Sequence, residues 1–326
     1  MDPLILYDPF DRMQFTNQHC FLCGIPTTPA QTITVYPQWL IRKYDLGDKP
    51  LQLLDKSIKT IGELTIPCCS ACERHHVQPL ETAVQQAAEQ GLEGWRQLEE
   101  KQVFLWLGRI FYGMLVTELK TELNPLIAPE YGVGTNPKML MKFQSFFFLL
   151  QALRVPVEFA DFSPCSLFVV EVTPEPEQVP FELHDDLTSM MISLRLENVA
   201  IVGCLLDNGL VKRALRKVWE DVRVRRLHPK QLAELKARVY YGAYLLNVIP
   251  EYFARPRQPE DPHLVYDTLI DDITTSVFNP WENHVYAQTL EEMLKRWDIR
   301  QAEILQNPRR PLGFLYDEEG QFREMV

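Results

Sequence analysis

Apolar residues recur along this chain with two periods, which predict helices in some regions and strands in others. A spacing of three to four residues predicts helices at residues 37–44, 81–88, 93–123, 138–153, 229–246 and 281–297. The longest of these carries Trp95, Trp106 and Ile110 at helical spacing. Residues 138–153 are apolar nearly all round, so we expect that helix to be buried.

Runs of β-branched and aromatic residues between turn residues predict strands. They occur at residues 32–36, 63–66, 155–159, 166–172, 188–196 and 199–206. Turn chemistry at residues 196–198 and 207–209 indicates that the middle strands form a small, mainly antiparallel sheet. The four prolines within residues 250–262 predict an extended connection. The fold class that follows is α+β, with helices packed on this sheet behind a distinct N-terminal module.

Composition places the chain among ordinary globular proteins. Of its 326 residues, 46% are hydrophobic and 24% are charged. The net charge of −11 repels phosphate, so contact with nucleic acid would require a local basic face. The N-terminal residues lack a basic region followed by an apolar run, and residues 103–116 are too short to span a bilayer. We therefore expect a cytoplasmic protein that does not enter a membrane.

The seven cysteines change this picture, because four of them form two C-x2-C pairs, Cys20 with Cys23 and Cys69 with Cys72. A zinc ion takes four thiolates at the corners of a tetrahedron, and each pair can supply half of it. In a reducing compartment such pairs favour a metal over disulfides. The alternative is four buried, unligated cysteines. Two independent pairs with the same spacing favour structural Zn²⁺.

The cysteine next to the second pair leaves one ligand open. Cys68 could replace Cys69, although the two-residue spacing to Cys72 favours Cys69 as the ligand. Gly24 follows the first pair directly, as expected where a tight metal-binding turn needs a positive φ.

Three segments follow one another around these pairs: Cys20-x2-Cys23-Gly24, then TITVYPQWL from Thr32 to Leu40, then Pro67-Cys68-Cys69-x2-Cys72. This order resembles the treble-clef core of HNH endonucleases. In particular it resembles a bacterial subgroup with a CxxCG knuckle, an acidic-His-Val-aromatic-Pro-x-Trp-Leu segment and a later CxxCN knuckle. The resemblance covers residues 19–85. It implies a zinc-binding, ββα-metal-like module at residues 1–90, followed by a helix-rich α+β body at residues 91–326.

The resemblance also implies where catalytic residues would lie, and this sequence departs from it there. In active HNH enzymes a histidine of the middle segment is the general base, and the residue before it often binds the catalytic cation. These positions hold Thr34 and Ile33. Isoleucine cannot bind a hard cation, and a threonine hydroxyl has no pKa near 7 with which to replace imidazole. Glu73 stands where the subgroup has asparagine after the second knuckle.

A relocated catalytic site remains an alternative, because Glu73, His75 and His76 follow the second knuckle. Against it, two adjacent histidines on a helix point in different directions. The simpler interpretation is that these histidines are solvated residues at the start of a helix, or neighbours of the zinc site.

One stretch of this acidic chain is basic and could contact nucleic acid. Residues 212–226 contain seven basic and two acidic residues around one tryptophan. Basic side chains can follow a phosphate backbone while an aromatic ring stacks on a base. The simpler interpretation is a solvated helix face with a tryptophan in the core. The candidate contact residues are Lys212, Arg213, Arg216, Lys217 and Trp219.

Two functions therefore stay open. The first is a non-catalytic zinc protein that binds nucleic acid or another protein, and the second is a divalent-metal-dependent HNH-type nuclease with relocated residues. Since no glycine-rich phosphate loop is present, we expect no nucleotide cofactor. Residues 138–326 carry no motif that would assign them an activity of their own.

Overall fold

The computed structural model describes residues 5–11, 13, 15, 18–122, 136–174, 179–258, 260–270 and 276–325. The chain forms two compact units, each discontinuous in sequence. The first comprises Met1–Gln90, Gln97–Phe162 and Glu251–Leu269, and the second comprises Gly91–Arg96, Ser163–Pro250 and Ile270–Val326. The first unit thus contains the predicted module of residues 1–90 together with two later segments.

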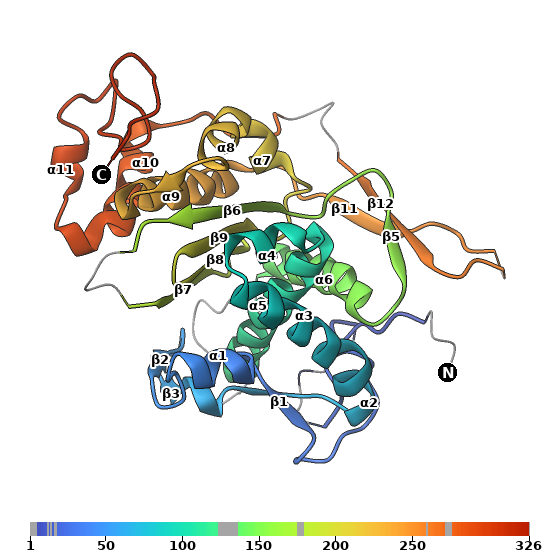
Figure 1. The fold of residues 1–326 in the computed structure, drawn as a ribbon. Coiled ribbons are helices and arrows are strands. Elements are labelled where there is room, and N and C mark those ends of the chain that lie inside the picture. The colour runs from blue at the N-terminus through green and yellow to red at the C-terminus, as the bar shows by residue number, and fades with distance from the viewer. Residues whose placement is uncertain are drawn as a thin grey trace. The chain divides into compact units, whose positions relative to one another are not determined.

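The first unit combines helices with three small sheets (Figure 1). Strand β1 pairs with β4 in antiparallel register, β2 pairs with β3, and β12 lies between antiparallel β11 and parallel β5. Its elements are β1 (Thr32–Thr34), α1 (Gln38–Lys43), β2 (Pro50–Gln52), β3 (Ile58–Thr60), η1 (Ile61–Glu63), β4 (Thr65–Pro67), α2 (Ser70–Cys72), η2 (Glu73–Val77), α3 (Gln78–Glu89), α5 (Glu100–Glu122), α6 (Pro137–Leu150), η4 (Gln151–Leu153), β5 (Val157–Phe159), β11 (Glu251–Ala254) and β12 (Leu264–Leu269).

Helix α5 forms the centre of the first unit because it is buried on nearly all sides. Phe104 and Phe111 pack edge-on against Phe146 of α6. A Cβ at Gly113 would lie 2.8 Å from Val35 Cγ1, so glycine allows the segment after β1 to approach the helix axis. The predicted burial of residues 138–153 holds for part of the segment: Phe143, Phe146, Leu149 and Leu150 are fully enclosed, whereas Met141 is 59% exposed.

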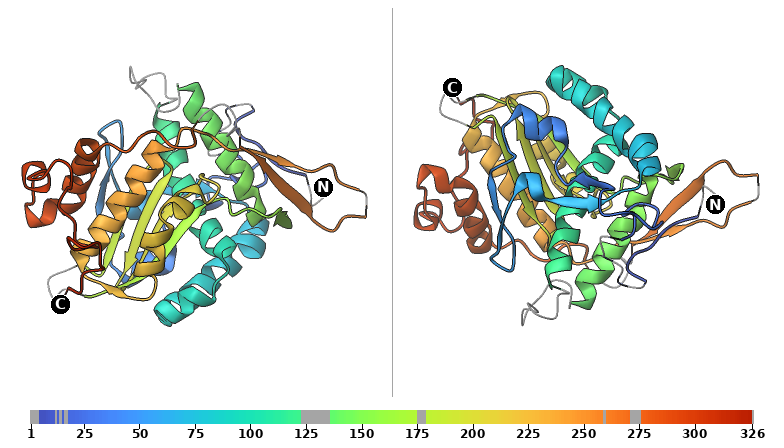
Figure 2. Two further views of the ribbon diagram at one scale, coloured as in Figure 1. Left: turned by 90° about the horizontal axis from the view of Figure 1, so that it is seen from above. Right: turned by 90° about the horizontal axis from the view of Figure 1, so that it is seen from below.

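The second unit is built on a five-stranded sheet in the order β10-β6-β9-β8-β7. Neighbouring strands are antiparallel except for β10 and β6, so the predicted, mainly antiparallel character holds. Helix α9 lies along one face of this sheet (Figures 1 and 2). The elements are α4 (Leu92–Gln97), β6 (Ser166–Val172), β7 (Phe181–Asp186), β8 (Met191–Leu196), β9 (Val199–Cys204), α7 (Leu210–Ala214), α8 (Arg216–Val222), β10 (Arg226–Leu227), α9 (Pro229–Leu245), α10 (Asn283–Leu294), η5 (Lys295–Trp297) and α11 (Gln301–Ile304).

Three sequence predictions need correction. The single helix predicted over residues 93–123 is two helices, α4 and α5. Gln102 Oε1 accepts the Glu99 backbone N–H at 3.0 Å and so caps the N-terminus of α5. Strand β7 was not predicted, because most of its residues are charged or polar and their burial does not alternate along the strand. The connection predicted at residues 250–262 begins with strand β11, which pairs with β12. β11 is an edge strand, and an edge strand can have prolines close to it because its outer side forms no backbone hydrogen bonds.

The described helices include none with the length and apolar character that crossing a bilayer would require.

A buried carboxylate organises the turn between β9 and α7. Asp207 Oδ2 accepts the Ser166 hydroxyl at 2.5 Å and the Val211 backbone N–H at 2.8 Å, and the Ser166 hydroxyl in turn accepts the Lys212 N–H. Burial outweighs these hydrogen bonds and raises the pKa of Asp207 from 3.8 to about 6.

We expect this carboxylate to make the protein less stable as pH rises from about 4 to about 6. The folded state holds the Asp207 proton through a pH range in which the unfolded state has released it. At about 1.4 kcal/mol per pKa unit, the loss amounts to roughly 2–3 kcal/mol. Urea unfolding at several pH values should show this decline. It should be smaller but not absent in the Asp207→Asn variant, because burial also raises the pKa of Asp185 to about 6. An unchanged pH dependence in the variant would contradict the assignment.

Candidate metal centre

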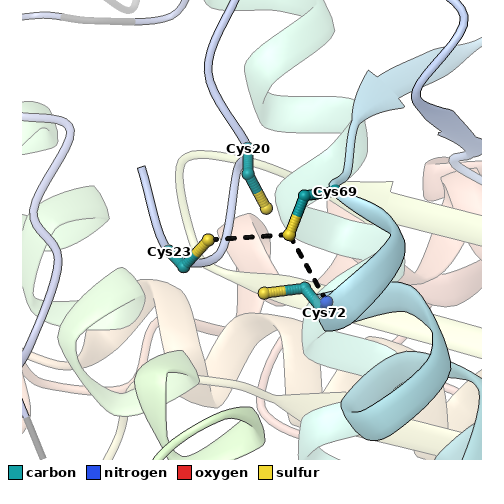
Figure 3. A group of neighbouring side chains, drawn as sticks. All are labelled: Cys20, Cys23, Cys69 and Cys72. Carbon is teal, nitrogen blue, oxygen red and sulfur yellow. Dashed lines mark hydrogen bonds between the residues drawn. The ribbon is translucent and has the colours of Figure 1, made fainter. Parts of the chain in front are cut away.

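Four cysteine sulfurs converge in the first unit at a distance suited to one metal ion. The Sγ atoms of Cys20, Cys23, Cys69 and Cys72 all lie within 4.8 Å of one another. Their side chains point toward a common centre (Figure 3). Cys23 Sγ lies 3.8 Å from Cys69 Sγ. A tetrahedron with metal–sulfur bonds of about 2.3 Å has edges of about 3.8 Å. These four residues are therefore close enough to bind a metal ion.

The first pair lies in a tight turn closed by backbone hydrogen bonds. The Cys20 N–H donates to Ile25 O at 2.8 Å, and the Gly24 N–H donates to Cys20 O at 2.9 Å. Gly24 adopts a φ of 72°, as its position in the sequence predicts. Between the two cysteines, the Leu22 carbonyl accepts a hydrogen bond from Gln151 Nε2 at 3.1 Å. The turn is thus fixed by its own backbone and by a distant side chain.

The second pair lies at the start of a helix. Cys69 precedes α2, and its sulfur accepts the Cys72 backbone N–H at 3.4 Å. The helix continues through the π-helical turn η2 into α3. The two halves of the centre are joined by the backbone, because the Phe21 N–H donates to Pro67 O at 2.8 Å. Helix and loop therefore present their sulfurs in a fixed relation.

The choice between Cys68 and Cys69 is decided by geometry. Cys69 belongs to the group of converging sulfurs and Cys68 does not. The Cys68 thiol lies 3.7 Å from the Cys69 carbonyl, and its backbone N–H donates to Gln31 O at 2.9 Å. Cys68 is buried beside the centre.

Four thiols at this separation cannot all ionise without a cation. Hydrogen bonds from Cys23, Cys68 and Cys72 lower the pKa of Cys20. The same bond to Cys20 raises the pKa of Cys23 to about 12 and raises the pKa of Cys68 and Cys72 further. A bound divalent cation removes this conflict, because it stabilises all four thiolates together.

The turn at Gly24 leaves no room for a side chain, and this gives a direct test. A Cβ there would lie 2.4 Å from Tyr7 Cε2, and the positive φ alone costs an L-residue about 1–2 kcal/mol. We expect Gly24→Ala to lose at least about 2 kcal/mol in urea unfolding and to release metal more readily to a chromophoric chelator. Gly91→Ala is the matched control, since Gly91 has a φ of 65° with no atom within 4 Å. Equal losses in both variants would rule out the Tyr7 contact.

A pocket of about 360 Å³ lies between β1 and α3, and Glu73, the residue after Cys72, is part of its lining. Thr34, Glu73 and Glu81 are among the residues that line it. Glu81 Oε1 lies 2.6 Å from Arg109 Nη2, and Arg109 Nη1 donates to the Thr34 carbonyl at 3.1 Å. The ion pair therefore connects α3, α5 and β1.

Two tryptophans complete this network. The indole N–H groups of Trp39 and Trp106 both donate to Glu81 Oε2, at 3.2 and 3.1 Å. Their rings stack with centroids 6.1 Å apart. Glu81 is thus held by a guanidinium and two indoles, which leaves its carboxylate poorly placed to serve as a base or a cation ligand.

The weaker catalytic candidates do not meet at one point. Glu73 lines the pocket with Thr34, whereas neither His75 nor His76 lines it. His75 is exposed and His76 is half-buried, both within η2. Burial, followed by the charge of Arg154, lowers the pKa of His76. Three residues from four consecutive positions are therefore distributed around the helix.

The basic stretch of the second unit lies on α7 and α8, where most of its side chains have internal contacts. Lys212 Nζ lies 5.2 Å from the centre of the Trp219 ring, and that ring packs edge-on against Phe168. Arg216 pairs with Glu220 at 3.8 Å. Arg213 donates to the Asn208 carbonyl at 3.0 Å. Lys217 differs, because it lies over Tyr316 and lines a separate pocket of the second unit.

Two supporting residues were missed by the sequence interpretation. Gln151 follows a buried helix and carries no signal that it will reach the first turn. Arg109 does carry a signal, because it is the one charge within an otherwise apolar stretch of α5. A charge in such a position must be paired, although the sequence does not name the partner.

Comparisons with models of protein families, with curated proteins and with solved structures find no match for this chain.

Proposed function

We propose that this protein is a zinc-stabilised, HNH-like binding protein in which the metal is structural and nuclease catalysis is absent. The supporting observation is the closed set of four cysteine sulfurs, with separations up to 4.8 Å. Structural zinc sites have four protein ligands, whereas catalytic sites leave one position open for water or substrate. A set of four thiolates leaves no such position.

Zinc is the metal that this ligand set fits best. Tetrahedral thiolate sites in proteins hold zinc or iron, and Zn²⁺ has no redox chemistry of its own.

The order of elements around the cysteines supports the HNH-like part of the proposal. A metal-binding turn is followed by the β1–β4 pair, and the second cysteine pair lies at the start of the next helix. This order is the one expected from the treble-clef resemblance, which covers residues 19–85.

The absence of catalysis is proposed from the pocket beside the centre. The positions that the resemblance assigns to the base and to the cation ligand hold Thr34 and Ile33, and both line this pocket. The nearby carboxylate of Glu81 is paired with Arg109 at 2.6 Å. An HNH-type site needs an imidazole and ligands for a hard cation facing solvent. This pocket instead contains the Arg109–Glu81 ion pair and the Trp39 indole.

The test combines metal analysis with a cleavage assay. Purified protein should contain one zinc per chain and no iron, and it should leave supercoiled plasmid intact in Mg²⁺ or Mn²⁺. The same samples in a gel-shift assay would report binding to nucleic acid, and their failure to shift would favour a protein partner.

Metal-dependent cleavage would overturn the proposal and favour the relocated nuclease. In that case the activity should fall in His75→Ala or His76→Ala and persist in Arg74→Ala. Arg74 lies in the same π-helical turn and serves as the matched control.

A further inference from the structure

The second unit contains a pocket of about 610 Å³ that no motif in the sequence announces. It is formed by α9, α10, α11 and the segment that follows α11. This volume lies in the range of small-molecule sites. All of its lining residues belong to the second unit.

Cationic side chains gather in this pocket although the chain as a whole is acidic. Five of them line it: Lys217, Arg238, Arg309, Arg310 and Arg323. Within the described part of the chain, no ion pair joins the Arg309 or Arg323 side chain to a carboxylate, and Lys217 Nζ lies 5.2 Å from the centre of the Tyr316 ring. Arg238 uses Nε and Nη2 on Glu234, at 2.8 and 2.7 Å, which leaves Nη1 available.

Four carboxylates also line the pocket, and three of them are bound by backbone N–H groups. Glu234 is fully buried and accepts the backbone N–H groups of Phe314 and Leu315. Glu303 accepts the Arg300 N–H at 3.2 Å. Asp317 accepts those of Glu319 and Gln321. The fourth, Glu318, is exposed. Five cationic and four anionic side chains thus give the lining a formal charge of +1, and backbone N–H groups fix the positions of three of the carboxylates.

A second observation points to a ligand. Tyr286 lines the pocket and is 4% exposed, yet its hydroxyl has no hydrogen-bond partner among the described residues. A buried hydroxyl without a partner destabilises a fold, so such groups usually have a ligand or water to bind. Its ring lies 4.8 Å from that of Trp281, which is 42% exposed in the same pocket.

We propose that this pocket binds a nucleoside phosphate. Arg309, Arg323 and the free edge of Arg238 supply the planar donor groups that recognise phosphate oxygens. The half-exposed indole of Trp281 offers a face on which a base can stack. The buried Tyr286 hydroxyl supplies a further donor. This site requires no glycine-rich loop, and it does not depend on the zinc proposal.

The experiment is isothermal titration of the full-length protein at fixed low salt. The probes are the four nucleoside 5′-monophosphates, inorganic phosphate, adenosine and a 5′-phosphorylated single-stranded octanucleotide. At least one monophosphate should bind about tenfold more tightly than phosphate or adenosine, because it engages both the arginines and the indole. Competition by the octanucleotide would identify the end of a strand as the source of the ligand. Its failure to compete would identify a free nucleotide.

Variants separate this site from general charge effects. Arg309→Ala and Trp281→Ala should each weaken binding about tenfold. Arg223→Ala is the matched control, because Arg223 lies outside the pocket and pairs with Glu220 at 3.2 Å; it should change affinity less than twofold. Tyr286→Phe should weaken binding while leaving the melting temperature equal or higher, a combination that a purely structural hydroxyl would not give. No binding by any monophosphate, or equal losses in the control, would overturn the proposal.

Discussion

Replacing Cys72 by alanine should release the metal and unfold the N-terminal module of residues 1–90. The folding free energy contributed by a structural zinc site is on the order of 10 kcal/mol, which is comparable to or larger than the stability of a typical domain. The three remaining cysteines would hold the ion more weakly. Mass spectrometry should find less than one zinc per chain, and limited proteolysis should cut within residues 19–72.

Cys68→Ala is the matched control for this experiment. It removes a buried thiol next to the second pair without removing a ligand, so it should keep one zinc and lose only about 1 kcal/mol of packing energy. The pair of variants also tests the ligand set. Retention of metal by Cys69→Ala together with its loss in Cys68→Ala would contradict the assignment of Cys69.

Replacing Glu81 by glutamine should destabilise the first unit by about 3–5 kcal/mol. Arg109 is 2% exposed, and removing the charge beside it leaves a buried guanidinium uncompensated. The amide oxygen of glutamine can still accept the indole N–H groups of Trp39 and Trp106, so the loss reports the charge. Urea unfolding followed by circular dichroism measures the change, and tryptophan fluorescence reports the local environment.

An exposed ion pair provides the control for this prediction. Glu93 pairs with Arg96 at 2.8 Å, but their side chains are 74% and 46% exposed, so Glu93→Gln should cost less than about 1 kcal/mol. The double variant Glu81→Gln with Arg109→Met should recover much of the loss, because no buried charge remains. A loss in Glu81→Gln as small as that in Glu93→Gln would show that water reaches the guanidinium.

Several features of this protein could be predicted from its sequence because they depend on neighbouring residues. The positions of most helices follow from apolar periodicity, and the buried character of α6 follows from its composition. The two cysteine pairs follow from spacing, and so does the positive φ at Gly24. The α+β class and the mainly antiparallel sheet of the second unit follow from the runs of strand-forming residues.

Other features depend on which distant segments meet, and no local pattern records this. Cys68 and Cys69 are chemically identical neighbours, and only the direction of their side chains at the start of α2 separates them. The position of Arg109 within an apolar stretch predicts a buried charge. It does not predict the partner, Glu81, which lies on another helix. The pocket of the second unit collects arginines from separate elements whose spacing in the sequence has no period.

Periodicity and spacing act over a few residues, so the sequence determined the local elements and the two halves of the metal centre. The joining of those halves, the pairing of Arg109 with Glu81 and the convergence of the arginines were decided by the tertiary structure. The physical reason is that burial forces polar and charged groups to find partners, and only packing determines which partners are within reach.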